Sequence, residues 1–328
     1  MQDIGKIVAE KYDLEIKNIF PFRDSFIINT VKGKKIVKKN PLSPERISFI
    51  HGAKEHLYKN NFKNLDRYLC TTEGAPCFIA EDTCYTVSDV IEGTECNFEN
   101  EADIIRASNL LASLHKASRG YIPLENSIPR NELGKLPGYF YKRLEDIKKL
   151  KKAAKKGRSK FDYLFLDYVD YFYNLGENTL GMLVSSKYDQ MVKTAESEGI
   201  FCHHDFTQYN IVSCSEKLFL TNFEYCCFEL KVYDIVNFIR RKMRKCNWDI
   251  NEARIIVDEY KKTETLGEDD LLIMKILLQF PQKFWRVANR YYNSRRSWSE
   301  RIFISKLQEV IDEIEGHRSF LDSFDILY

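Results

Sequence analysis

The sequence changes character near Gly93, and this change limits the possible folds more than any other feature. Before Gly93, short runs rich in β-branched residues lie at 25–31 and 35–38, and Gly33 between them can form a tight turn. Such runs are typical of a β-hairpin, and a second hairpin is predicted over residues 78–87. The first part of the chain is therefore expected to be rich in β-strands.

After Gly93, apolar side chains recur at three- and four-residue steps, for example over 104–117 and 269–292, and this spacing predicts amphipathic helices. A length of 328 residues is enough for two domains or for one large two-lobed domain. We therefore expect an α+β, bilobal fold, with a small β-rich lobe at residues 1–91 and a larger, mainly helical lobe at residues 92–328.

The composition excludes several classes of protein. With 44% hydrophobic residues the chain has ample material for a core, so a disordered chain is excluded. No run approaches the ~18 apolar residues of a membrane-spanning helix. The nine cysteines are odd in number and include no Cys-x-x-Cys pair, so we expect buried, reduced thiols rather than a disulfide framework or a zinc ribbon. The sequence does not begin with a secretory signal, and we expect synthesis in the cytoplasm.

The charge pattern gives little support to a nucleic-acid partner. Segment 148–160 is strongly basic and could dock an anionic surface, but a solvated helix end is the more common explanation. A nucleic-acid site built from this segment together with Arg295 and Arg296 is poorly supported by a net charge of +2. We expect no nucleic-acid partner and no membrane span.

One segment, residues 201–212, carries a chemical pattern. His203, Asp205 and Asn210 form His-x-Asp-x-x-x-x-Asn ahead of an apolar strand. The catalytic loop of protein-kinase-type phosphotransferases has this spacing: its Asp accepts the proton of the attacking hydroxyl, and its Asn reaches the Mg²⁺ on the phosphates. The spacing matters because base and metal ligand must converge on one γ-phosphate. It predicts Asp205 as the catalytic base and Asn210 as a metal ligand.

Two other interpretations of this segment compete. The run Cys202, His203, His204 and Asp205 suggests a metal site, but neighbouring residues of a strand point to opposite faces and cannot all bind one ion. The segment could also be an ordinary turn whose His and Asp satisfy local backbone groups. The order of further kinase-like features along the chain argues against this second interpretation.

These further features lie where a kinase-like chain needs them. Asn222 and Glu224 follow the catalytic loop by about a dozen residues, the place of a second metal ligand. Lys38 lies on the strand before the first long helix, where a lysine holds the α- and β-phosphates. A hinge between the lobes is predicted at residues 89–93. The order predicts a phosphotransferase-like site with Lys38, Asn210, Asn222 and Glu224 around Asp205.

The acidic partner of Lys38 stays open between two residues. Ser43 and Pro44 predict the start of a helix that runs to about Lys59. Glu45 lies at the start of this helix and Glu55 near its end, ~15 Å apart along the axis, so only one of them could reach the lysine. We favour Glu55 slightly as the second residue of the nucleotide site.

Nearly the whole chain resembles the aminoglycoside phosphotransferase and choline kinase superfamily, and within it the CotS type of spore-coat protein of endospore-forming bacteria. The more specific segments are 38–57, 91–96, 203–210 and 233–240. This resemblance implies a protein-kinase-like fold. It also implies synthesis in the mother cell followed by deposition in the spore coat, with other coat proteins as partners.

The resemblance implies cofactors as well. ATP or GTP would bind with Mg²⁺, and a small molecule would accept the phosphate. The family usually has Asp-Phe-Asp where this chain has Asn222, Phe223 and Glu224. A carboxylate gives Mg²⁺ a full negative charge and an amide oxygen offers only a dipole; Glu224 could compensate, but with a different geometry. The turn at residues 22–25 also lacks the glycines that let backbone N–H groups approach phosphates.

Two functions follow from these observations. The favoured hypothesis is a structural or assembly component of the spore coat that keeps a kinase-like fold with weak or no catalysis. The alternative is an active Mg²⁺- and ATP-dependent small-molecule phosphotransferase, with Asp205 as the base. The substitution at Asn222 is the feature that favours the first hypothesis.

Overall fold

The computed structural model describes residues 4–293 and 299–328. Two compact units are present: Met1–Asn131 with Glu198–Phe228, and Glu132–Ser197 with Glu229–Tyr328. The predicted lobe boundary between residues 91 and 92 falls within the first unit and stays a prediction. Arg295 and Arg296 lie outside the described residues.

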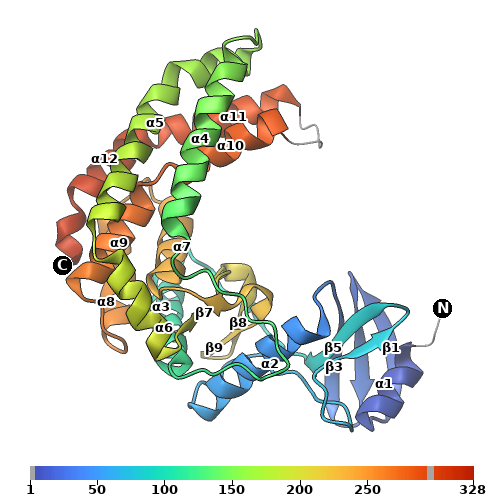
Figure 1. Cartoon of the computed structure of the whole chain (residues 1–328). Coiled ribbons are helices and arrows are strands. Elements are labelled where there is room, and N and C mark those ends of the chain that lie inside the picture. The colour runs from blue at the N-terminus through green and yellow to red at the C-terminus, as the bar shows by residue number, and fades with distance from the viewer. Residues whose placement is uncertain (1–3, 294–298) are drawn as a thin grey trace. The chain divides into compact units, whose positions relative to one another are not determined.

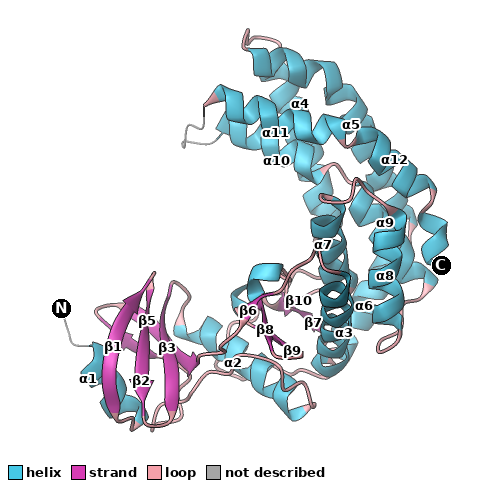
Figure 2. Ribbon diagram, turned by 180° about the vertical axis from the view of Figure 1, so that it is seen from behind, coloured by secondary structure: helices cyan, strands magenta, loops and turns pink. Residues whose placement is uncertain are grey.

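The first unit begins with a helix and a five-stranded antiparallel sheet (Figures 1 and 2). The sheet order is β1-β2-β3-β5-β4, which contains both predicted hairpins. A core of apolar side chains from the helix and the sheet includes Val8, Ile28, Val37 and Val87. The elements are α1 (Ile4–Tyr12), β1 (Ile16–Phe22), β2 (Ser25–Thr30), β3 (Gly33–Asn40), β4 (Phe78–Ala80) and β5 (Thr83–Asp89).

Strand β3 positions the predicted nucleotide lysine. Its neighbours are β2, where Ser25 lies opposite Lys38, and β5, where Thr86 lies opposite Lys38. Because side chains alternate along a strand, buried Val37 and partly exposed Lys38 point to opposite faces of the sheet. The turn before β3 places Gly33 at a φ of 99°, a conformation that glycine adopts without steric cost.

The first long helix, α2 (Pro44–Lys59), forms as predicted. The Ser43 side chain accepts a hydrogen bond from the backbone N–H of Arg46, and Pro44 takes the first turn, where it loses no hydrogen bond. Its buried stripe includes Ile47, Ile50, Ala53 and Leu57, the three- and four-residue spacing expected of an amphipathic helix.

Two small sheets complete the first unit and hold the motif between them. One has the strand order β6-β8-β9 and the other pairs β7 with β10. Strand β7 leads into the His-x-Asp segment, β8 leaves it, and the β8–β9 hairpin returns the chain to Asn222. The elements are β6 (Thr94–Glu95), α3 (Glu101–Ser118), β7 (Phe201–Cys202), η1 (Gln208–Asn210), β8 (Ile211–Cys214), β9 (Lys217–Leu220), η2 (Phe223–Tyr225) and β10 (Cys227–Phe228).

The second unit is helical in its described residues. The periodic stretch 269–292 forms two helices rather than one, because Pro281 lacks a backbone N–H and interrupts the helix. A core of aromatic rings includes Phe165, Phe172 and Phe284, whose rings stack in sequence. The helices are α4 (Leu136–Ala154), α5 (Lys160–Ser185), α6 (Tyr188–Glu198), α7 (Val232–Met243), α8 (Ile250–Lys261), α9 (Glu268–Gln279), α10 (Gln282–Asn293), α11 (Glu300–Asp312), α12 (Ile314–Asp322) and η3 (Phe324–Leu327).

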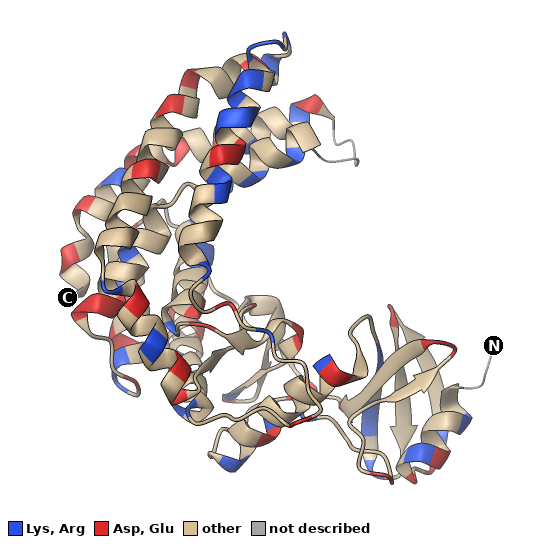
Figure 3. Ribbon diagram, in the orientation of Figure 1, with Lys and Arg blue, Asp and Glu red and all other residues tan. Residues whose placement is uncertain are grey.

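The basic segment 148–160 lies at the end of α4 and in the turn that follows it (Figure 3). Lys148, Lys149, Lys152 and Lys155 are exposed, as predicted for a solvated helix end. None of the helices in the described part of the chain is both long enough and apolar enough to cross a membrane.

The absence of a side chain at Gly93 allows the chain to approach β8 closely, and we predict that a side chain there would be destabilising. A Cβ atom at this position would lie 2.3 Å from the backbone oxygen of Ser213, which pairs with Thr94 across the two strands. Gly93→Ala should therefore lower the free energy of unfolding by about 1–3 kcal/mol. The measurement is urea unfolding followed by circular dichroism.

Gly181→Ala is the matched control, because a Cβ atom there meets nothing within 4 Å and the residue lies inside α5. Alanine is the better helix former, so this variant should be as stable as the wild type or more stable by up to about 1 kcal/mol. Equal midpoints for Gly93→Ala and the wild type would contradict the close approach of Gly93 to Ser213.

Candidate functional site

The two segments that carry the motif are joined by backbone hydrogen bonds. Thr221 N–H donates to the carbonyl oxygen of Asn210 at 2.8 Å, directly after the β8–β9 hairpin. The next residue, Asn222, has the left-handed conformation with φ 65° and ψ 58°. Asparagine tolerates this conformation better than most residues. The turn directs the side chain of Asn222 back toward the catalytic-loop segment.

His203 holds this arrangement from inside the unit. Its side chain is fully buried, and its Nε2 donates to the carbonyl oxygen of Thr221 at 3.0 Å. Its Nδ1 accepts from the backbone N–H of Asp205 at 3.3 Å, which assigns the proton to Nε2. The ring also packs edge-on against Phe223 at 4.8 Å between centroids. With both ring nitrogens bound to backbone groups, His203 has a positioning role and not that of a metal ligand.

Four predicted site residues form one hydrogen-bonded chain. Asn210 Nδ2 donates to the Asp205 carboxylate and to its backbone carbonyl, both at 2.8 Å. Asn210 Oδ1 accepts from Asn222 Nδ2 at 3.2 Å. Asn222 Oδ1 in turn accepts from Lys38 Nζ at 2.8 Å. The structure therefore brings Lys38, Asn222, Asn210 and Asp205 together, although Lys38 lies more than 180 residues from Asn222 in the chain.

Glu224 binds Lys38, the residue at the other end of this series of hydrogen bonds. Its carboxylate forms an ion pair with the Lys38 ammonium group. The Lys38 side chain is 41% exposed and that of Glu224 is 21% exposed, so the pair lies at the surface of the first unit. The positive charge that would bind phosphate oxygens is thus matched by a carboxylate of the same unit.

These contacts decide how well the site fits Mg²⁺. A magnesium ion prefers carboxylates and other oxygen ligands in near-octahedral geometry. Here the side-chain oxygen of Asn210 accepts a hydrogen bond from Asn222 Nδ2, and the carboxylate of Glu224 is paired with Lys38. The donor set as it stands is committed to hydrogen bonds and does not fit Mg²⁺, so we derive no step through a metal ion.

The structure does not form the pair predicted between Lys38 and Glu55. Within the described residues, Glu55 accepts hydrogen bonds from Arg67 at 2.8 and 2.6 Å, and Lys38 has Glu224 as its carboxylate partner. The alternative residue, Glu45, is fully exposed, and its pKa is lowered by the Ser43 hydroxyl and the backbone of the first helical turn. The physical reason is the η2 turn, which brings Glu224 to the lysine directly.

A buried ion pair beneath the site was missed by the sequence analysis. The Lys54 side chain is completely buried, and its ammonium nitrogen lies 2.9 Å from a carboxylate oxygen of Asp66. The ammonium group also lies 3.8 Å from the ring centroid of Tyr68 and 5.2 Å from that of Phe223. Burial lowers the pKa of Lys54, and the negative charge of Asp66 opposes this shift.

Asp66 connects this ion pair to the site. Its second carboxylate oxygen accepts from the backbone N–H of Asn222 at 3.4 Å. The segment before it is aligned with β9, since Leu220 N–H donates to Asn64 and Asp66 N–H donates to Leu220. The sequence did contain a signal: Lys54 continues the apolar stripe of Ile47 and Ile50 on α2, where a solvent-facing lysine is not expected.

The sequence pattern did not predict a role at the site for Arg46 either. Its guanidinium group donates to the carbonyl oxygen of Glu224 at 3.1 Å and also to that of Cys226. It lies 4.8 Å from the ring centroid of Phe49. Arg46 therefore ties helix α2 to the turn that carries Glu224, and it has a positioning role.

Comparison with known proteins identifies the family. The model of the family described as "Spore coat putative kinase YutH" matches residues 5–324. The chain belongs to this family. It is also similar to spore coat protein S of Bacillus subtilis (strain 168), with 26% identity over 304 residues that cover 92% of this chain and 86% of that protein. The resemblance to spore-coat proteins of the CotS type is thus confirmed.

Solved structures show the fold. An aminoglycoside phosphotransferase from Alicyclobacillus acidocaldarius matches with a TM-score of 0.86 and 21% identity, covering 98% of this chain and 95% of that one. The AMP-bound spectinomycin phosphotransferase APH(9)-Ia matches with a TM-score of 0.65 and 12% identity, covering 96% and 97%. These likenesses confirm the expected protein-kinase-like α+β fold. At this level of identity they establish the fold alone.

We predict that the Lys54–Asp66 pair stabilises the first unit only as a pair. Asp66→Asn keeps an oxygen for the Asn222 N–H but leaves a buried ammonium group without a counter-charge. The expected loss is about 3–5 kcal/mol of unfolding free energy at neutral pH. The second change Lys54→Met in the same chain should recover part of this loss, because it removes the uncompensated charge.

The stability of Asp66→Asn should also depend on pH. In Asp66→Asn, folding disfavours the charged form of Lys54, so the unfolded chain binds more protons than the folded one. The stability of the variant should therefore rise with pH toward the ordinary pKa of lysine, and its deficit should shrink. Urea unfolding at several pH values measures this. A deficit in Asp66→Asn that Lys54→Met does not reduce would contradict the ion-pair interpretation.

Proposed function

We propose that this protein is a structural or assembly component of the spore coat, in which the kinase-like fold provides architecture with weak or no phosphotransfer. The observation that carries this proposal is the closed hydrogen-bonded chain from Lys38 to Asp205, which is complete without a metal ion.

The amide side chain of Asn222 links the two halves of this hydrogen-bonded network. An amide has both a donor and an acceptor, so Asn222 can donate to the oxygen of Asn210 and accept from Lys38 at the same time. An aspartate in its place would have no donor, and its carboxylate would face the oxygen of Asn210. That pair of oxygens is stable only when a cation lies between them. Asparagine replaces the metal ion by a hydrogen bond.

The charge at Lys38 supports the same proposal. A nucleotide phosphate would have to displace Glu224 from the lysine before it could use that charge. The exchange replaces one ion pair by another, so the net gain from the lysine is reduced. A lysine that is already paired is suited to holding strand β3 against the turn at residues 222–224 rather than to binding a nucleotide.

The family adds the biological setting to this proposal. The chain belongs to a family of spore coat putative kinases and is similar to spore coat protein S of Bacillus subtilis. We infer that this chain is made in the mother cell, is deposited in the spore coat, and has other coat proteins as partners.

The alternative function is an active small-molecule phosphotransferase that uses ATP or GTP with Mg²⁺. The convergence of Asp205, Asn210 and Lys38 favours it, since these are the positions of base, metal ligand and phosphate-binding lysine in kinase-like sites. Among similar structures, a spectinomycin phosphotransferase has AMP bound and an amicoumacin kinase is in complex with AMP-PNP and Ca²⁺. In this alternative Asp205 would take the proton of the acceptor hydroxyl, and Glu224 would have to release Lys38.

The two functions predict different responses of the wild type to Mg²⁺ with ATP or GTP in thermal unfolding. A ligand present at ~100 times its dissociation constant adds about 2.7 kcal/mol, which shifts the midpoint by a few degrees in a chain of this size. We expect no such shift for the wild type. We expect a Mg²⁺-dependent shift in Asn222→Asp, because the new carboxylate faces the oxygen of Asn210 and needs a cation.

The control is Asn222→Asp combined with Lys38→Ala, in which the nucleotide part of the shift should disappear. A shift of several degrees in the wild type that needs both Mg²⁺ and nucleotide, is abolished by Lys38→Ala and is accompanied by transfer of phosphate would overturn the structural proposal. It would establish the alternative and start a search for the acceptor.

A further inference from the structure

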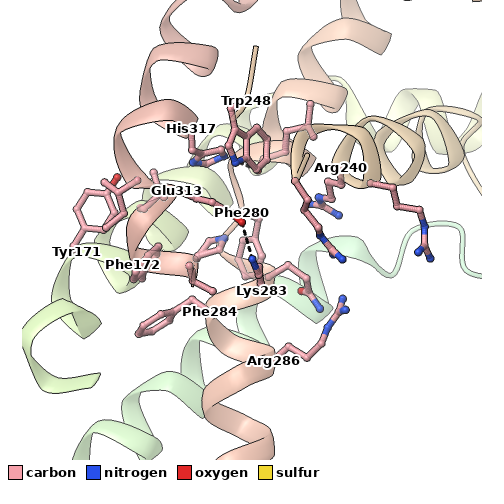
Figure 4. A pocket seen from close by; sticks show the side chains of 18 of the residues that line it. Tyr171, Phe172, Arg240, Trp248, Phe280, Lys283, Phe284, Arg286, Glu313 and His317 are labelled. Atoms are coloured by element: carbon pink, nitrogen blue, oxygen red, sulfur yellow. Dashed lines mark hydrogen bonds and ion pairs between the residues drawn. The ribbon is translucent and has the colours of Figure 1, made fainter. Parts of the chain in front are cut away.

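A second candidate site lies wholly within the helical unit. A cavity of about 140 Å³ opens between α5, α7, the connection from α9 to α10, and the start of α12 (Figure 4). Its lining residues all belong to Glu132–Ser197 and Glu229–Tyr328. None of them belongs to the site around Asp205, so this cavity is independent of the function proposed above.

The charges around this cavity are strongly unbalanced. Four arginines and one lysine line it, whereas Glu313 is the one carboxylate among its described lining residues. Glu313 is bound by Lys283 at 2.7 Å. Three of the four arginines, Arg240, Arg244 and Arg286, are therefore left without a carboxylate of the described lining.

Arg240 shows the cost of this imbalance most clearly. It donates to the carbonyl oxygen of Leu277 in the last turn of α9, and this contact uses only part of its guanidinium group. Burial lowers its pKa to about 10, and the positive charges of Arg286, Arg143 and Arg244 act in the same direction. Tyr233 opposes this shift. In the described part of the chain, Arg240, Arg244 and Arg286 form no ion pair with a carboxylate.

The opposite side of the cavity is aromatic. Figure 4 shows Tyr171 and Phe172 across the cavity from Arg240 and Arg286, with Trp248 and His317 between them at one end. Phe172 and Trp248 are buried. His317 donates from Nε2 to the carbonyl oxygen of Leu278, and burial lowers its pKa, so it adds no positive charge at neutral pH.

Two polar atoms of the lining strengthen the case for a ligand. The indole N–H of Trp248 and the side-chain oxygen of Gln282 are both buried and have no hydrogen-bond partner among the described residues. Buried polar groups in native proteins almost always have a partner. The indole N–H is a donor from which an anionic oxygen can accept, whereas the Gln282 oxygen needs a donor, such as an N–H or O–H group elsewhere on a ligand.

We propose that this cavity binds a small organic anion, a phosphate ester or a carboxylate with an apolar or aromatic body. Guanidinium groups present paired N–H donors that match the oxygens of phosphate and carboxylate groups. The anionic group would face Arg240 and Arg286 and relieve the repulsion among the arginines. The apolar body would pack against Phe172 and Tyr171, as in other ligand pockets with apolar walls and a few placed polar groups.

Isothermal titration calorimetry of the full chain with phenyl phosphate, benzoate and uncharged benzyl alcohol tests this proposal. We expect at least one of the two anions to bind at a single site, and benzyl alcohol to bind at least tenfold more weakly. Arg240→Gln and Arg286→Gln should each weaken the binding of that anion by about tenfold or more, the usual effect of losing a hydrogen bond to a charged group. The ratio between phenyl phosphate and benzoate identifies the preferred anionic group.

Arg254→Gln is the matched control, because Arg254 is an exposed arginine of α8 outside the cavity, and its loss should leave the affinity unchanged. Lys38→Ala should also leave the affinity unchanged, which separates this cavity from the candidate nucleotide site. Arg286 is exposed, so Arg286→Gln should fold normally, as circular dichroism can verify. Absence of binding by both anions, or full affinity in Arg240→Gln and Arg286→Gln, would overturn the proposal.

Discussion

A single buried ion pair supports the arrangement of the candidate site. The ammonium group of Lys54 has no access to solvent, so it needs the carboxylate of Asp66 beside it. Asp66 can satisfy this need only where the chain before it is fixed against β9, and its other oxygen then accepts from the backbone of Asn222. The buried charge of Lys54 therefore supports the left-handed turn at Asn222 through Asp66. This turn sets the direction of the Asn222 and Glu224 side chains.

The site that this ion pair supports contains the predicted kinase-like residues, but the side chains of Asn222 and Glu224 change its chemistry. The predicted base Asp205, the predicted metal ligand Asn210 and the predicted phosphate-binding lysine Lys38 lie together in one hydrogen-bonded network with Asn222. Two side chains on one turn alter what they can do: the amide of Asn222, where the resemblance implies a carboxylate, and Glu224, which forms an ion pair with Lys38. Asn222 donates to the side-chain oxygen of Asn210, and Glu224 pairs with Lys38. A catalytic site would keep the first group for a metal ion and the second for a nucleotide. These contacts support the proposal that the protein is a structural component of the coat with weak or no catalysis.

The sequence was sufficient for those parts of the fold and site that depend on local patterns. Strand alternation and Gly33 predicted the β2–β3 hairpin, helix capping by Ser43 predicted α2, and motif spacing predicted that Asp205 and Asn210 lie together. The partner of Lys38 could not be predicted in this way, since Glu224 is 186 residues away in the chain and competes with two helix residues for the same lysine. Lys54, Asp66 and Arg46 were missed for the same reason: their roles exist only after α2 has packed against the turn at residues 223–225.

The bond between Asn210 and Asn222 has a consequence for the conditions under which the first unit keeps its form. Both partners are neutral amides, so their attraction does not titrate with pH and is little affected by the screening that weakens ion pairs in concentrated salt. A metal bridge in the same place would be lost whenever a chelator or a competing ion removed the cation. The two segments 203–210 and 220–224 thus remain joined by a contact that is insensitive to the ionic composition of the surrounding medium.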